Sequence, residues 1–238
     1  MNFLFVVPKF AGAGEYYSFP IGLAYIVSYM RHKGFNVFCL NSCHSDDPIE
    51  QQLRKCIEDK HIDVVCTGSM SSYWNEVNEV VETAKRINPQ IITVVGGALI
   101  TSGPKLALEN MKIDYGVIGE GEITMTELAG ALTSNGDMGK VKGLIFHDKA
   151  DGFTVTAPRE VILDLDSLPF PDYEGLEFST WLSARWLKQP MLGGLLFDID
   201  DRKNFYEILT SRSCPFNCTF CYHPLGQKYR QRSLDNVF

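Results

Sequence analysis

Short apolar runs along the chain alternate with longer segments in which apolar residues recur every three or four positions. The apolar runs are typical of buried strands and lie at 3–7, 36–40, 63–67, 91–95 and 114–118. The amphipathic segments predict helices at 21–33, 49–59, 75–87, 104–110 and 123–133. Because a helical crossover returns each strand in the direction of the previous one, this alternation predicts a parallel sheet.

The predicted fold class is α/β, with a doubly wound, Rossmann-like sheet of five parallel strands. Five strands favour the flavodoxin-like strand order. In such sheets the ligand crevice lies beyond the carboxyl ends of the strands, where the strand order reverses. We therefore expect binding residues in the loops that follow the strands.

After residue 140 the pattern changes. The apolar segments 141–147 and 153–157 flank Asp151 and Gly152, which predicts a β-hairpin. Residues 163–173, LDLDSLPFPDY, contain Pro169 and Pro171 and predict an extended strap between domains. A short helix is expected at 181–189 and a strand at 205–210. We place a first domain at 1–140, a hairpin and linker at 141–203, and the start of a second domain at 204–238.

Three cysteines follow the last predicted strand within a single loop, SRSCPFNCTFCY. Cys214, Cys218 and Cys221 have the spacing C-x-x-x-C-x-x-C. Three thiolates on one loop can bind three irons of a 4Fe–4S cluster and leave the fourth iron free for a small molecule. The alternative is a zinc site with His223 as the fourth ligand. Zinc ligands usually come as two short pairs from separate parts of the chain, so the spacing favours the cluster.

This loop resembles the signature of the radical S-adenosylmethionine (radical SAM) superfamily, including the aromatic Phe220 before the last cysteine. The resemblance implies that the three cysteines bind the 4Fe–4S cluster. It also implies that Phe220 and Tyr222 contact S-adenosylmethionine, with Phe220 shielding the cluster. The cluster would then cleave S-adenosylmethionine to a 5′-deoxyadenosyl radical.

Nearly the whole chain resembles the cobalamin-binding branch of that superfamily. The shared segments include TGSMSSYW, VVGGALITSGP and GVIGEGEITMTEL, each starting at the end of a predicted strand. The resemblance implies cobalamin as a further cofactor. Small residues and glycines at strand ends let a flat ligand approach the backbone, although they also serve in ordinary turns and helix caps. The candidate cobalamin contacts are Ser69, Met70, Ser71, Gly96, Gly97, Glu120 and Gly121.

Two motifs are missing. Gly12 and Gly14 follow the first strand, but Tyr17 occupies the place of the third glycine that a dinucleotide site needs, which argues against NAD. The chain also lacks the Asp-x-His-x-x-Gly motif by which many cobalamin proteins supply a histidine to cobalt. We therefore expect cobalamin to bind without a protein histidine ligand.

The resemblance implies a radical SAM enzyme that transfers a methyl group from cobalamin to an unactivated carbon of a small-molecule substrate, with flavodoxin or ferredoxin as electron donor. Ring closure or rearrangement is the alternative chemistry, in which the first domain is degenerate and binds no cobalamin. A barrel of βα units needs roughly 200 residues, whereas 17 follow Cys221 (238 − 221). A second hypothesis is therefore a truncated cofactor-binding module that is inactive by itself, and no catalytic residue is assigned.

Composition narrows the choice of partners. The net charge is −7 and no cluster of basic residues occurs, which argues against nucleic acid. No apolar stretch is long enough to span a bilayer and no signal peptide is recognisable, so we expect a cytoplasmic protein.

Seven cysteines, an odd number, fit a reducing compartment. The other four are interpreted as small apolar residues of the core. They are Cys39, Cys43, Cys56 and Cys66.

Overall fold

The computed structural model describes residues 1–13, 15, 17–148, 152–183, 207–223 and 225–238. Within these residues one sheet has the strand order β2-β1-β3-β4-β5-β6-β7. Its parallel strands are β1 (Asn2–Val7), β2 (Asn36–Asn41), β3 (Val64–Gly68), β4 (Ile92–Gly96) and β5 (Tyr115–Val117). The predicted Rossmann-like sheet is thus confirmed, in the flavodoxin-like order.

The predicted hairpin forms and extends this sheet. Its strands are β6 (Leu144–His147) and β7 (Phe153–Val155). Strand β6 pairs antiparallel with β5, matching Gly116 with Ile145, and β7 pairs with β6. The hairpin that the sequence analysis grouped with the linker therefore continues the first domain's sheet.

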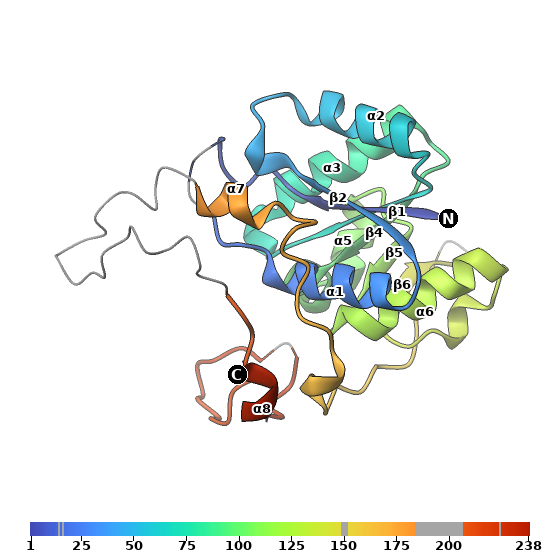
Figure 1. Cartoon of the computed structure of the whole chain (residues 1–238). Helices are drawn as coiled ribbons and strands as arrows, with labels where there is room; N and C mark the ends of the chain where they lie inside the picture. The colour runs from blue at the N-terminus through green and yellow to red at the C-terminus, as the bar shows by residue number, and fades with distance from the viewer. Residues whose placement is uncertain (14, 16, 149–151, 184–206, 224) are drawn as a thin grey trace.

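Helices cover both faces of the sheet (Figure 1). Clusters of buried side chains place α1 and α6 on one face and α2, α3 and α5 on the other. Among the residues described, no helix is long and apolar enough to cross a membrane. The helices of this domain are α1 (Ile21–His32), α2 (Ile49–Lys60), α3 (Trp74–Ile87), α4 (Gly97–Ser102), α5 (Pro104–Asn110) and α6 (Gly121–Ser134). Short 3-10 turns are η1 (Ser42–His44), η2 (Ser71–Tyr73), η3 (Met138–Lys140) and η4 (Leu165–Ser167).

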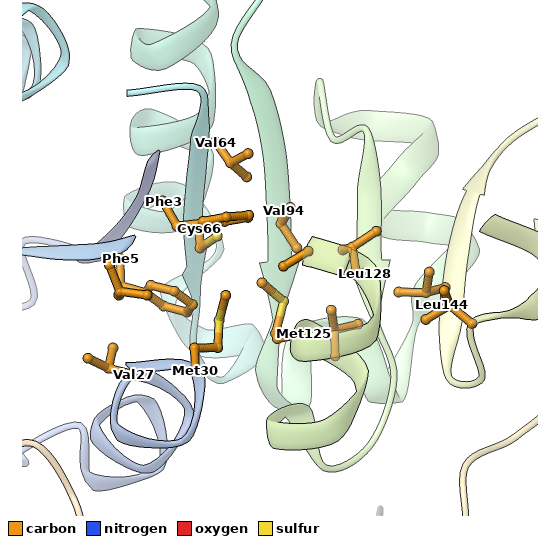
Figure 2. Packing of buried hydrophobic residues seen from close by; sticks show 14 residues of the cluster. Phe3, Phe5, Val27, Met30, Val64, Cys66, Val94, Met125, Leu128 and Leu144 are labelled. Carbon is orange, nitrogen blue, oxygen red and sulfur yellow. The ribbon is translucent and has the colours of Figure 1, made fainter. Parts of the chain in front are cut away.

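Strand β1 lies in the middle of the core and is buried on both sides. Successive side chains of a strand point to opposite faces, so Phe3 and Phe5 pack toward α1, whereas Leu4 and Val6 pack toward α2 and α3. Figure 2 shows Val27 and Met30 of α1 beside Phe5, with Met125 and Leu128 of α6 farther along the same face. This two-sided burial explains why residues 3–7 of the strand are all apolar.

The strap, which in the structure starts one residue earlier than predicted, at Ile162, leaves the hairpin and runs along α1. Its apolar residues Ile162, Leu165 and Leu168 form a small cluster against Tyr29 and Ile123. Farther along, the backbone of Asp172 donates to the carbonyl oxygen of Ala24 (3.1 Å), and the Asp172 carboxylate pairs with Arg31. The segment is extended apart from η4, as Pro169 and Pro171 predict.

Two predictions beyond the strap need correction. The helix expected at 181–189 begins earlier, as α7 (Phe178–Leu182), because Phe178 and Trp181 are buried together with Phe19; residues 184–189 lie outside the described part. The strand expected at 205–210 is absent from the described residues 207–210. It begins instead as β8 (Ser211–Arg212), where a partner exists in β9 (Arg230–Gln231). Helix α8 (Leu234–Val237) follows.

Replacement of Gly116 by alanine tests the tight packing between the hairpin and the parallel sheet. An added Cβ would lie 2.6 Å from Ile145 Cγ2 and 3.1 Å from Ile100 Cγ2. We expect Gly116→Ala to lower the free energy of unfolding by about 1–3 kcal/mol, measured by urea denaturation. Gly130→Ala in α6, where the new Cβ meets nothing within 4 Å, is the control and should stabilise by roughly 0.5–1 kcal/mol. Equal stability of both variants would contradict the packing argument.

Candidate functional site

Strands β3 and β4 end side by side, and the residues after them form one crest on the carboxyl edge of the sheet. Gly68 pairs in register with Gly96, and the backbone of Leu99 donates to the carbonyl oxygen of Ser69 (3.0 Å). Five of the predicted cobalamin contacts are therefore neighbours in space. They are Ser69, Met70, Ser71, Gly96 and Gly97.

The close approach of the two backbone segments in this crest requires glycine at positions 68 and 97. A Cβ on Gly68 would lie 2.5 Å from the Gly96 carbonyl oxygen, and one on Gly97 would lie 2.7 Å from the Ser69 carbonyl oxygen. Gly97 also has φ of +80°, in the left-handed region. Gly97 and Ser71 are exposed, and 57% of the Met70 surface is accessible. The crest thus presents open backbone and small side chains, a surface that fits the approach of a broad, flat ligand.

Glu120 and Gly121 follow β5, the next strand, but both are buried. The Glu120 carboxylate accepts hydrogen bonds from Arg230 Nη1 (2.8 and 2.9 Å), from Arg212 Nη1 (3.2 Å) and from the backbone of Ile162 (2.7 Å). These donors occupy the Glu120 side chain, and the predicted contact of Glu120 with cobalamin stays a prediction.

Sequence reasoning missed three charged residues around Glu120. Glu122 is buried at the start of α6 and pairs with Arg212, and Arg230 lies closer to Glu120 than Arg212 does. All four charged side chains have at most 11% of their surface exposed. The sequence indicated these residues in part, because Arg212 lies two residues before Cys214 and the two glutamates lie in the segment GEGE. Their pairing joins residues about a hundred positions apart, which no local pattern indicates.

The three cysteines of the predicted cluster lie on one loop at the surface. Cys214 is half-buried, and Cys218 and Cys221 are exposed. The backbone of Cys221 donates to the carbonyl oxygen of Cys218 (3.0 Å), which closes a turn between them. Cysteine sulfur is a suitable ligand for iron. Among the described residues, however, no group of three His, Cys, Asp or Glu side chains is placed so that it could hold a metal ion. The ligand role of the cysteines, and the zinc alternative with His223, therefore remain predictions.

The aromatic residues of this loop differ in their contacts. Phe220 is 90% exposed. Tyr222 is also largely exposed, but its hydroxyl donates to Ser102 Oγ at the end of α4 (3.1 Å). The predicted contacts of both residues with S-adenosylmethionine stay predictions, and the structure adds a contact between the cysteine loop and the helix that begins at Gly97.

The remaining four cysteines lie within the first domain and behave as core residues. Burial raises the pKa of the Cys66 thiol and raises that of Cys39 to about 12. Burial likewise raises the pKa of Cys43 and Cys56. These thiols stay protonated at neutral pH, which fits their interpretation as small apolar residues.

His44 follows β2 at the same carboxyl edge, and both of its ring nitrogens are engaged. Nε2 lies 2.7 Å from the Tyr17 hydroxyl, and Nδ1 lies 2.7 Å from Glu177 Oε2. The hydrogen bond from His44 lowers the pKa of Glu177. His44 thus links the loop after β1 to the residue directly before α7. The expectation of cobalamin without a histidine ligand stays a prediction.

Comparison with curated proteins finds relatives over most of the chain. An uncharacterized methyltransferase of Pyrococcus horikoshii is 29% identical over 221 residues, which are 92% of this chain and 44% of that protein. The anaerobic magnesium-protoporphyrin IX monomethyl ester cyclase of Rubrivivax gelatinosus is 28% identical over 229 residues, which are 93% of this chain and 38% of that protein. The chain therefore spans less than half the length of these relatives.

Among solved structures, the radical S-adenosylmethionine methyltransferase TsrM of Kitasatospora setae has a similar fold. It aligns over all of this chain and 44% of its own, with a TM-score of 0.70 and 21% identity. These matches confirm the predicted resemblance to cobalamin-binding radical SAM proteins. The family of the B12 binding domain matches residues 10–129, half of the sequence, which include strands β2 to β5 and the crest. This chain belongs to the B12 binding domain family.

Proposed function

We propose that the chain is the cofactor-binding front part of a cobalamin-dependent radical SAM enzyme that methylates an unactivated carbon of a small molecule. The observation that carries the proposal is the three-cysteine loop, which lies C-terminal to a B12 binding domain and contacts it through Tyr222 and Ser102. The methyltransferase of Pyrococcus horikoshii and the radical methyltransferase TsrM support it as relatives in sequence and in fold.

In this proposal the crest after β3 and β4 binds cobalamin. Gly96 and Gly97 leave the backbone open, and Ser69, Met70 and Ser71 supply small or flexible side chains beside it. Gly121 contributes by close packing, since its missing Cβ leaves room for Ile26 of α1. These residues would hold cobalamin at the carboxyl edge of the sheet.

Cys214, Cys218 and Cys221 would hold three irons of a 4Fe–4S cluster, with S-adenosylmethionine at the fourth. The chemistry supplied there, when the cluster is reduced by an electron donor such as flavodoxin or ferredoxin, is cleavage of S-adenosylmethionine to a 5′-deoxyadenosyl radical. Phe220 and Tyr222, next to Cys221, would then cover the cluster and contact S-adenosylmethionine.

Oxidative ring closure is the second candidate reaction, because a relative is named as a cyclase. Both reactions need the same cluster, and they differ in whether cobalamin is used. A module that binds cofactor without catalysis is the other alternative, and it predicts cobalamin binding without any iron–sulfur cluster.

The cluster is tested by anaerobic reconstitution of the chain with iron and sulfide. We expect a brown protein with about four irons per chain, and Cys218→Ala should lose most of the iron and the visible absorption because one ligand is gone. Cys56→Ala is the matched control, since this thiol lies in α2 of the first domain. A wild-type chain that takes up zinc stoichiometrically and holds no iron and sulfide would refute the cluster.

The cobalamin crest is tested with hydroxocobalamin followed by desalting. We expect the wild type to remain red and Ser71→Trp to lose most of the bound cobalamin, because a large ring at this exposed position would block the crest. Asn110→Trp is the control, since it is exposed at the end of α5, toward the opposite edge of the sheet. Equal retention of cobalamin by Ser71→Trp and wild type would place the ligand elsewhere.

A further inference from the structure

The short ribbon before and after the cysteine loop brings two arginines together. Strand β8 pairs with β9 over two residues each, and Arg212 lies directly opposite Arg230. A ribbon this short has little stability of its own, and like charges on facing residues disfavour it further. The ribbon therefore depends on partners from outside.

Those partners come from the B12 binding domain. Glu120 lies after the carboxyl end of β5 and accepts hydrogen bonds from Arg230 and Arg212. Glu122 lies in the first turn of α6 and accepts a hydrogen bond from Arg212. The two carboxylates balance the two guanidiniums; Glu120, Glu122 and Arg230 are buried, and the Arg212 side chain is 11% exposed. Arg230 Nη1 also donates to the carbonyl oxygen of Ile162 in the strap (2.9 Å).

The ribbon in turn fixes the start of the cysteine loop. Ser213 follows β8 with φ of +62°, in the left-handed region that a serine rarely adopts. Arg230 Nη2 donates to Ser213 Oγ (3.2 Å). The next residue is Cys214, so a continuous path of contacts leads from Glu120 through Arg230 and Ser213 to the first cysteine.

The other end of the loop is also attached to the B12 binding domain. Tyr222, directly after Cys221, contacts Ser102 at the end of α4, and α4 begins at Gly97 in the crest. Both ends of the cysteine loop are thus held by segments that follow β4 and β5. These are the same segments that carry predicted cobalamin contacts.

We propose that Glu120 and Glu122 are positioning residues, which hold the β8–β9 ribbon and so place Cys214 relative to the cobalamin crest. Neither carboxylate needs to touch a cofactor for this role. The consequence for the cluster rests on the proposed function, whereas the anchoring of residues 211–232 by the two glutamates can be measured without any cofactor.

The anchoring is tested by hydrogen exchange on the full chain without cofactors. In Glu122→Gln and Glu120→Gln, we expect amides within 211–232 to exchange faster by roughly a hundredfold, since a buried guanidinium loses its charged partner. Exchange in β3 and β4 should stay unchanged. Glu160→Gln is the matched control, because Glu160 pairs with Lys142 on the surface with 78% of its side chain exposed.

The second readout is spectroscopic and uses the chain reconstituted with iron and sulfide. The electron paramagnetic resonance signal of the reduced cluster, with and without S-adenosylmethionine, should change in Glu122→Gln and stay as in wild type in Glu160→Gln. Arg212→Lys keeps the positive charge but loses the guanidinium, whose two Nη atoms donate to Glu120 and Glu122. It should therefore show an intermediate exchange rate and an altered electron paramagnetic resonance signal.

Unchanged exchange at 211–232 in folded Glu122→Gln and Glu120→Gln would overturn the proposal. Should Glu120→Gln fail to fold, Glu122→Gln and Ser213→Ala decide, because each removes fewer contacts of the network. A wild-type chain that binds no cluster would refute the proposed function, while the exchange rates of the variants would still decide the anchoring.

Discussion

The pairing of Glu120 and Glu122 with Arg212 and Arg230 is the constraint on which the arrangement of the crest and the cysteine loop depends. Buried charges are costly when alone, and the loss of one partner from such a pair typically destabilises by about 3–5 kcal/mol. The network therefore favours one position of the ribbon over all others. It links a domain whose sheet is complete without the ribbon to a segment that has little structure by itself.

The strap is the third component of this arrangement. Its residues Ile162 and Leu168 contribute backbone groups to Arg230 and Arg232, while their side chains pack beside Tyr29 of α1. Arg232 also lies over the rings of Tyr25 and Phe170. Apolar packing sets the path of the strap along the domain, and the arginines then attach the C-terminal segment to that path. The cysteine loop is therefore positioned by the domain through two layers of contacts.

The sequence predicted the sheet well and the attachment poorly, for a physical reason. Strands such as β1 and helices such as α3 are encoded by local periodicity, and the crest follows from the rule that parallel strands end at one edge. The contact of Glu120 with Arg230 joins positions 110 residues apart, so Glu120 looked like a ligand contact. The prediction of a strand at 205–210 was wrong for the same reason, because pairing with β9 determines where strand β8 begins.

The hairpin of β6 and β7 has a consequence for solubility. A parallel sheet that stopped at β5 would expose a row of unpaired backbone groups, which can recruit a strand from another molecule. Strand β6 covers that row, and the new border, β7, is only three residues long with Asp148 close to its start. So short a border offers little template for intermolecular pairing, and it closes this side of the sheet while the crest at the carboxyl edge stays open.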